Sequence, residues 1–101
     1  MTNSERVLNL LGLAQRAGKL ITGEELTIDD IRREKTKVVF VASDASGNTR
    51  KKIKDKSSYY AVPYFERFNQ AELSHAIGKI RMVVGVNDAG FAKKLIELLS
   101  E

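Results

Sequence analysis

The sequence contains no cysteine, and this absence excludes several kinds of chemistry at once. Without thiols the chain can form no disulfide, no thiolate zinc site and no cysteine nucleophile. Histidine is almost as scarce, because His75 is the only one and has no carboxylate at a spacing that would obviously orient it. We interpret it as structural or solvated rather than as a general base. The composition therefore predicts a protein that is not an enzyme and that binds no metal or cofactor.

Long apolar segments are also missing. The longest uninterrupted apolar run is five residues, 38 to 42, whereas a membrane-spanning helix needs about 20. The first 19 residues do not follow the order of a secretion signal, because Glu5 and Arg6 precede only a short amphipathic run. With 101 residues, one proline and no low-complexity tract, we expect a single soluble domain, 1–101, in the cytoplasm and away from membranes.

Charge is unevenly distributed along the chain. Seventeen Lys and Arg against 13 Asp and Glu give a net charge of +4. Residues 31 to 56 contain nine basic and three acidic side chains, whereas residues 20 to 30 contain four acidic and no basic ones. This segregation predicts one positive surface, and a polyanion is its natural partner.

Hydrophobic spacing predicts alternating helices and strands. The first helix starts with Ser4 as its cap, and the second opens at Thr22-Gly23 with Leu26, Ile28 and Ile31 as its buried stripe. Three further helices are predicted over residues 49–56, 69–77 and 88–99, and extended segments over residues 20–21, 38–43, 59–65 and 82–87. The alternation indicates a three-layer α/β/α sandwich.

Two of the predicted strands have distinct positions in the sheet. The run VVFVAS, 38 to 43, is β-branched and apolar without polar alternation, which is typical of a central strand covered on both faces. Pro63 interrupts the segment 59–65 and cannot donate to a strand ladder, so this strand is expected at an edge.

Three stretches are candidates for binding a polyanion. NTRKKIKDK, 48 to 56, places five cations on a short helix, although a solvated helix face would have the same composition. GKIRM, 78 to 82, combines a glycine, two cations and an apolar residue in a connecting loop, which suits unstacked RNA bases. RAGKLITGEE, 16 to 25, leads through Gly23 into the second helix.

The second helix carries four carboxylates near its start: Glu24, Glu25, Asp29 and Asp30. Acidic side chains in a first helical turn stabilise the helix by about 0.3–1 kcal/mol each through its dipole. A magnesium site at Asp29 and Asp30 is not favoured, because adjacent helical residues point about 100° apart.

These motifs, in this order, resemble a known family. LLGLAQRAGKLITGEE, KTKVVFVASDASGNTRKKI, AELSHAIGK and VVGVNDAGFAKKL, between residues 10 and 99, are similar to the kink-turn-binding ribosomal proteins of the L-seven-Ae and L-thirty-e superfamily, and in particular to its bacterial YlxQ-like branch. The resemblance implies a four-stranded mixed sheet in an α/β/α sandwich, and non-catalytic binding of a bulged, sharply bent RNA.

The resemblance also implies which residues contact RNA. Gly23 brings the helix start close to the RNA, and Gly78, Lys79, Ile80 and Arg81 fall on the second gripping loop. Lys19 and Lys37 are expected to neutralise phosphates, and Glu24 and Glu25 at the helix start are also expected among the RNA-binding residues.

The chain departs from the kink-turn pattern at the start of the second helix. Kink-turn readers have an Asn-Glu pair and, three residues later, a Lys that contact guanines. Here these places are taken by Glu25, Leu26 and Asp29. Leu26 cannot hydrogen-bond a base, and Asp29 reverses the expected charge. The RNA target is therefore expected to differ from a standard kink-turn.

Three functions remain open from the sequence. The first is a translation- or ribosome-associated RNA-binding protein, with structured RNA and ribosomal proteins as partners and no small-molecule substrate. The second is a protein-interaction module whose acidic helix start docks on a basic ribosome-associated partner. The third is a detached substrate-recognition domain of an RNA-modifying methyltransferase, although 101 residues leave no room for a cofactor-binding domain.

Overall fold

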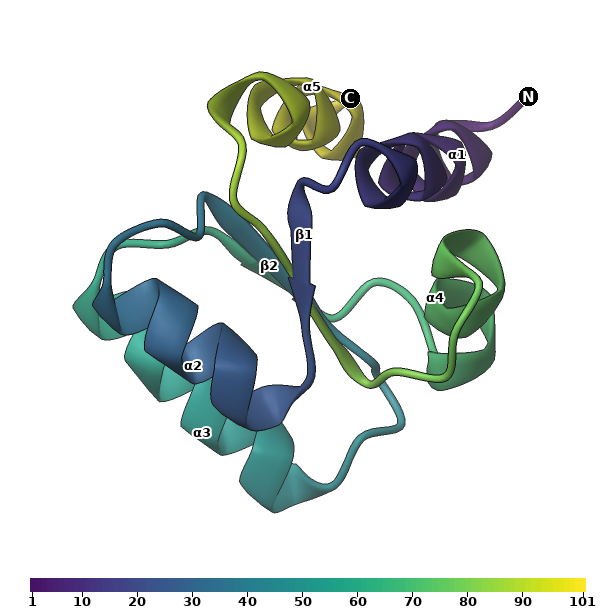
Figure 1. Ribbon diagram of the computed structural model, residues 1–101. Coiled ribbons are helices and arrows are strands. Elements are labelled where there is room, and N and C mark those ends of the chain that lie inside the picture. The colour runs from purple at the N-terminus through teal and green to yellow at the C-terminus, as the bar shows by residue number, and fades with distance from the viewer.

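The computed structural model describes all 101 residues as a four-stranded sheet between two layers of helices (Figure 1). Each helix is followed by a strand until the closing helix, as the spacing predicts. The elements are α1 Asn3–Arg16, β1 Leu20–Thr22, α2 Glu24–Arg32, β2 Val38–Val41, α3 Gly47–Tyr59, β3 Tyr64–Phe65, α4 Gln70–Ile77, β4 Val83–Val86 and α5 Ala89–Ser100.

The strand order is β1-β4-β2-β3, so the last strand in the sequence lies between the first two. Strand β4 is antiparallel to both β1 and β2, while β2 and β3 are parallel, which confirms the mixed sheet. Strand β2 is central and every residue in it is buried, as its apolar run predicts. Strand β3 lies at the edge, where Val39 N donates to the carbonyl of Pro63 at 2.9 Å.

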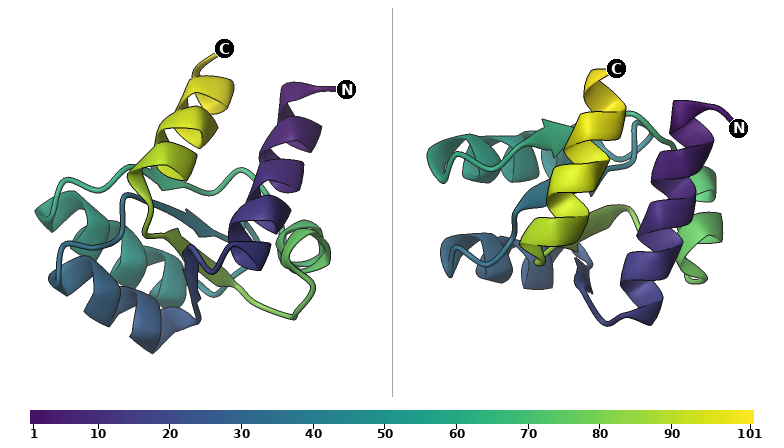
Figure 2. Two further views of the ribbon diagram at one scale, coloured as in Figure 1. Left: turned by 45° about the horizontal axis from the view of Figure 1, so that its top comes forward. Right: turned by 90° about the horizontal axis from the view of Figure 1, so that it is seen from above.

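The two helical layers cover opposite faces of the sheet (Figures 1 and 2). Helices α1, α4 and α5 lie on one face and α2 and α3 on the other. Helix α2 lies directly over β4, because a Cβ added at Gly85 would be 2.9 Å from the Ile21 Cγ2 atom and 3.1 Å from the Thr27 Cγ2 atom. This close packing fixes the position of the first turns of α2 relative to the sheet.

The core-facing side of α2 differs from the prediction. Leu26 is 60% exposed, and the buried residues are Thr27, Ile28 and Ile31. The physical reason is helical geometry, because residues two apart, such as Leu26 and Ile28, do not share a face, whereas Thr27 and Ile31 are one turn apart. Leu26 therefore belongs to the surface and not to the core stripe.

Helix boundaries show smaller differences. Helix α1 is capped by Thr2 in a reciprocal capping box with Glu5, and not by Ser4. Helix α3 continues to Tyr59, beyond the predicted end at residue 56, which shortens the strand expected over 59–65. The caps of α4 and α5, Asn69 and Asp88, agree with the predicted starts.

Candidate nucleic-acid interface

Two segments far apart in the sequence meet at one end of the sheet. The Arg81 Nε atom donates to the Thr22 hydroxyl at 3.2 Å across a separation of 59 residues, and Gly23 N donates to the carbonyl of Val83 at 2.9 Å. The start of α2 thus lies beside the loop that connects α4 to β4. We call this region, formed by Gly23, Leu26, Lys79, Ile80 and Arg81, the loop-end surface.

The loop from Gly78 to Arg81 is held in a defined shape. Gly78 ends α4 in the left-handed conformation, with φ of 79°. The Ser74 hydroxyl accepts from Arg81 N at 3.0 Å and donates to the carbonyl of Arg81 at 3.3 Å. Ile80 is 74% exposed at the tip, and Lys79 beside it is also exposed. The loop therefore presents an apolar side chain next to a cation from a fixed backbone.

The start of α2 is chemically different from the other helix starts. A side chain accepts from the first turn of each of the other four helices, through Thr2, Ser46, Asn69 and Asp88. Helix α2 instead follows Gly23, at φ 93° and ψ 152°, with no side-chain cap. Its first backbone N–H groups thus have no side-chain acceptor and point toward the region where a bound anion would lie.

Three of the four carboxylates of α2 interact with other groups of the domain. Glu24 pairs with Lys52 of α3 at 3.1 Å, and the Thr49 hydroxyl and the Lys52 ammonium together lower the pKa of Glu24.

Farther along α2, Asp29 lies 3.8 Å from Arg32, and Asp30 accepts from the buried Thr36 hydroxyl at 2.7 Å. Only Glu25 has no hydrogen bond or ion pair, and it is exposed. The acidic cluster is therefore largely structural.

Lys19 and Lys37 lie away from the loop-end surface. The carbonyl of Lys19 accepts from Asn87 N at 3.1 Å, and Lys37 N donates to the carbonyl of Val86 at 2.7 Å. Both lysines therefore flank the end of β4, whereas Gly23 lies at its beginning. The sheet separates these two lysines from the other predicted RNA contacts by the length of a strand.

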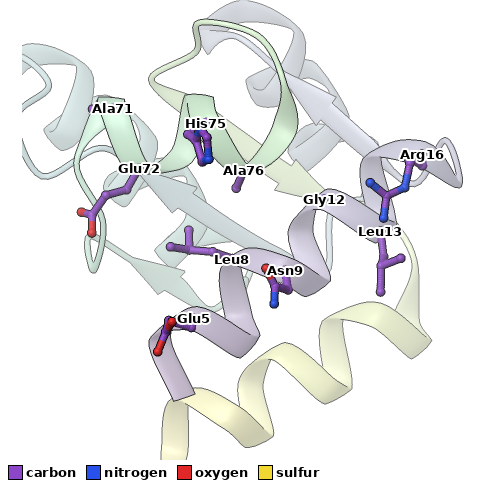
Figure 3. A pocket seen from close by; sticks show the side chains of 10 residues that line it. All are labelled: Glu5, Leu8, Asn9, Gly12, Leu13, Arg16, Ala71, Glu72, His75 and Ala76. Carbon is purple, nitrogen blue, oxygen red and sulfur yellow. The ribbon is translucent and has the colours of Figure 1, made fainter. Parts of the chain in front are cut away.

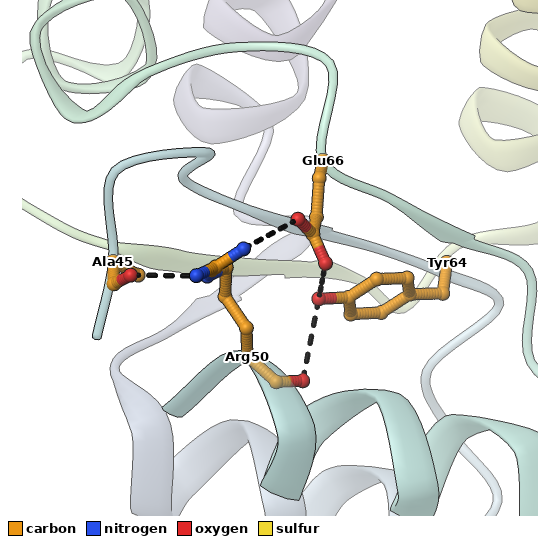
Figure 4. A network of polar contacts seen from close by, with 4 residues as sticks. All are labelled: Ala45, Arg50, Tyr64 and Glu66. Atoms are coloured by element: carbon orange, nitrogen blue, oxygen red, sulfur yellow. Dashed lines mark hydrogen bonds and ion pairs between the residues drawn. The ribbon is translucent and has the colours of Figure 1, made fainter. Parts of the chain in front are cut away.

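Most cations of the basic run in α3 have partners within the domain. Arg50 lies 3.5 Å from Glu66, whose other oxygen accepts from the Tyr64 hydroxyl at 2.6 Å (Figure 4). Arg50 also donates to the carbonyl of Ala45 at 3.1 Å, and burial together with Glu66 raises the pKa of Tyr64.

Two further cations of this run are paired, Lys51 with Asp55 at 2.8 Å and Lys52 with Glu24. Lys54 and Lys56 have no ion pair and remain free for a polyanion.

The largest groove lies on the other face of the sheet, between α1 and α4 (Figure 3). The helices approach so closely here that a Cβ added at Gly12 would be 2.9 Å from the carbonyl oxygen of Ala76. His75 lines the groove without a hydrogen bond, and Glu72 beside it caps the backbone of Asn69. No nucleophile, base and orienting group come together in this groove.

Two structural findings bear on other classes of site. No group of three or more His, Cys, Asp or Glu side chains is placed to hold a metal ion. None of the helices combines the length and apolar character required to cross a bilayer.

Sequence reasoning missed several residues that shape the loop-end surface. Thr22 and Ser74 hold Arg81, and Lys52 holds Glu24, through contacts between distant segments that no local pattern indicates. The exposure of Leu26 could have been predicted from the sequence, because residues two apart on a helix, such as Leu26 and Ile28, do not lie on the same face.

A sequence model of the ribosomal protein L7Ae/L30e/S12e/Gadd45 family matches residues 5–96 of the chain. The chain belongs to this family. An Enterococcus faecium protein named RNA-binding protein YlxQ is 66% identical over 97 residues, covering 96% of this chain and 94% of the relative. The protein of the same name from Bacillus subtilis is 53% identical over 91 residues, covering 89% and 91%. These relatives confirm the prediction that the chain belongs to the bacterial YlxQ-like branch of the family.

The L7Ae/L30e family assignment agrees with the fold. A Giardia lamblia 15.5 kDa RNA-binding protein superposes with a TM-score of 0.84 at 18% identity, covering 97% of this chain and 85% of that chain. At this identity the likeness concerns the fold alone. The named relatives are RNA-binding proteins of a non-catalytic family, so the chain is not an enzyme.

Proposed function

We propose that this protein binds structured RNA with a bend or bulge through the loop-end surface. The observation that carries the proposal is the hydrogen bond between Thr22 and Arg81, which joins the uncapped start of α2 to the loop bearing Ile80. A phosphate is favoured at the free N–H groups of the helix, and an unstacked base is favoured on the exposed apolar side chain. RNA-binding relatives of the same family support this assignment.

The RNA bound in this way differs from a standard kink-turn. Leu26 is 60% exposed and therefore lies on the surface at the start of α2 instead of in the core, yet it offers no hydrogen bond to a guanine edge. Asp29 is also exposed and, although it pairs with Arg32 at 3.8 Å, it presents a carboxylate where kink-turn readers have a cation. An apolar contact and a carboxylate thus replace the polar and basic contacts of kink-turn readers.

The cellular role that fits best is association with ribosomal or other translation-related RNA in the cytoplasm. Its support is membership of a ribosomal protein family and two relatives named as ribosomal proteins, the large-subunit eL30 of two fungi, each 35% identical. Ribosomal proteins are accordingly among its proposed partners.

The runner-up, an acidic docking face for a basic protein, is less well supported by the geometry. Such a face needs free carboxylates, and Glu24, Asp29 and Asp30 are already engaged by Lys52, Arg32 and Thr36. Glu25 alone offers little attraction, since single exposed ion pairs contribute about 0–1 kcal/mol.

Crosslinking in a native cell, followed by sequencing of the bound RNA, tests the proposal. We expect enrichment of bent internal loops or ribosomal fragments, with crosslinked peptides that include residues 78–82. Recovery of proteins without RNA would contradict the proposal and favour the docking function. A matched sample expressing Ile80→Asp should lose the enriched RNA while keeping its protein level.

A further inference from the structure

A pair of tyrosine rings, one exposed and one half-buried, lies at the opposite end of the α2–α3 layer. Tyr59, in the last turn of α3, is 79% exposed, which is more than Ile80 at the loop-end surface. Its ring centroid lies 4.9 Å from that of Tyr60 at an interplanar angle of 77°. An edge-to-face contact occupies one ring face at most, so Tyr59 keeps open ring surface toward solvent.

The aromatic pair is held by an ordered turn. Tyr60 N donates to the carbonyl of Lys56 at 3.2 Å and Val62 N to that of Ser57 at 2.8 Å. Between them Ala61 adopts a φ of 57°, a left-handed conformation that non-glycine residues seldom adopt. The turn is therefore specific, and little conformational freedom of the backbone remains to be lost on binding.

The turn that follows α2 faces Tyr60, but not Tyr59, across a small cleft. Glu34 and Lys37 line the cleft together with Tyr60, and Glu34 also has a left-handed φ of 60°. The Lys37 Nζ atom donates to the carbonyl of Glu34 at 3.2 Å, which offsets the negative end of the α2 dipole. The two helices thus end side by side, and Lys37 lies in the cleft that Tyr60 also lines.

Unpaired cations surround this end of the molecule. Lys56 precedes Tyr59 by one helical turn, and Arg33 and Lys35 are exposed in the turn after α2. None of the three forms an ion pair, and Glu34 is the one carboxylate in the turn. Exposed aromatic rings together with unpaired cations are the combination that binds single-stranded nucleic acid, through base stacking and phosphate contacts.

We propose that Tyr59, Tyr60, Lys37 and Lys56, with Arg33 and Lys35 around them, form a second RNA-binding surface that stacks an unpaired nucleotide flanking the structured RNA. We call it the tyrosine-end surface. The inference rests on the proposed RNA-binding function and extends it to a different part of the RNA. An acidic protein segment is the alternative ligand, and the test below separates the two.

The α2–α3 layer connects the two surfaces. Figure 1 shows α2 and α3 side by side and running in the same direction, so both helix starts lie at the loop end and both helix ends at the tyrosine end. A groove between them is lined by Glu25 and Lys52 near the starts and by Arg32 and Lys56 near the ends. A helix of nine residues is about 13 Å long, which two to three nucleotides of a single strand can span.

The test compares RNA hairpins with and without a tail. One hairpin carries a bulged internal loop, a second adds six uridines at the 5′ or the 3′ end, and a third probe is the hexauridine alone. Affinities are measured for the wild-type protein, Tyr59→Ala and Tyr59→Phe. Tyr59 is exposed, so these variants should fold normally, and circular dichroism together with the melting temperature verifies this.

We expect one of the tails to tighten wild-type binding by about five- to tenfold through stacking. Tyr59→Ala should remove this gain without changing affinity for the hairpin that lacks a tail, and Tyr59→Phe should retain it. Aromatic NMR signals of Tyr59 should shift with the tailed RNA only.

Three results would overturn the proposal: no gain from either tail, a gain that survives Tyr59→Ala, or equal Tyr59-dependent binding of a hexaglutamate peptide. The last would reassign the surface to an acidic protein. A different result would contradict the proposed function at the loop-end surface but not the tyrosine-end surface. In that case the wild-type protein would not bind the hairpin without a tail, yet would still bind hexauridine through Tyr59.

Discussion

The two ends of the α2–α3 layer differ in the chemical groups that they offer to a ligand. At the loop-end surface the cations are few, and the main features are free backbone N–H groups, a fixed loop and exposed Leu26 and Ile80. At the tyrosine-end surface the backbone offers helix C-termini, and unpaired cations and aromatic rings provide the attraction. The basic run of α3, residues 48–56, therefore does not by itself mark a binding surface, because Arg50, Lys51 and Lys52 are paired within the fold and only Lys54 and Lys56 are unpaired.

The largest effect should come from the backbone of the loop end. Gly23→Ala should lower the free energy of unfolding by about 1–3 kcal/mol, because φ 93° with ψ 152° is essentially restricted to glycine. Thermal and chemical unfolding measure this loss.

Gly18→Ala is the matched control, at the other end of β1. Neither glycine has an atom within 4 Å of an added Cβ, so both substitutions act through the backbone alone. With φ 72° the Gly18 substitution should cost only about 1 kcal/mol. Equal losses for the two variants would mean that the helix start is not specially constrained.

The next prediction exchanges the side chains of the α2 start. Glu25→Asn, Leu26→Glu and Asp29→Lys together should raise affinity for a standard kink-turn by at least about tenfold, or about 1.4 kcal/mol. The pattern then provides hydrogen bonds and a cation where the wild type has Leu26 and Asp29. Because Leu26 is 60% exposed, the triple variant should melt close to the wild type.

A wild-type protein that already binds a standard kink-turn at nanomolar concentration would contradict this reasoning. Recognition would then rest on the helix backbone and the loop, with the α2 side chains contributing little. Titration of both proteins with one kink-turn RNA and one hairpin without a kink distinguishes these outcomes.

A smaller effect is expected at the loop tip. Ile80→Asp should weaken RNA binding by at least about 1 kcal/mol, through lost apolar contact and added repulsion, with nearly unchanged stability. Leu13→Asp introduces the same charge at an exposed leucine of α1, outside the loop-end surface, and serves as the control. If the two variants bind RNA equally well, the site lies elsewhere.

The smallest effect concerns salt. For an RNA that contacts Lys19, Lys37, Lys79 and Arg81, the slope of log K against log salt should be about −2 to −4. Lys19→Gln with Lys37→Gln should make it shallower by about 1 to 2, since two phosphate contacts are lost. An RNA confined to the loop end should show no change. The same shift for both RNAs would place these lysines in the loop-end contact itself.

Much of the fold could be predicted from local patterns. The apolar run of β2 indicated its central position, and Pro63 indicated the edge position of β3, because each depends on its own segment. The burial of Leu26 was predicted wrongly, since an apolar residue was assigned to the core without regard to its helical spacing.

The site was harder to predict than the fold. Gly23 and the loop around Ile80 were singled out from their residue types and then matched to RNA contacts through the family resemblance, but the bond from Arg81 to Thr22 joins segments that only the folded chain brings together. The separation of Lys19 and Lys37 from Gly23 follows from the direction of β4, which sequence spacing does not reveal.

The position of β4 between β1 and β2 has a consequence for protein synthesis. Strands β1 and β2 do not touch each other, so the sheet cannot close until residues 83–86 have left the ribosome. Gly23 is synthesised early, whereas its neighbours on the loop-end surface, Lys79, Ile80 and Arg81, are synthesised immediately before β4. Such pairing between distant segments forms slowly compared with local structure. A growing chain therefore completes its loop-end surface only when β4 docks, and the buried residues of α5, Ala92, Leu95 and Leu98, join the core after that step.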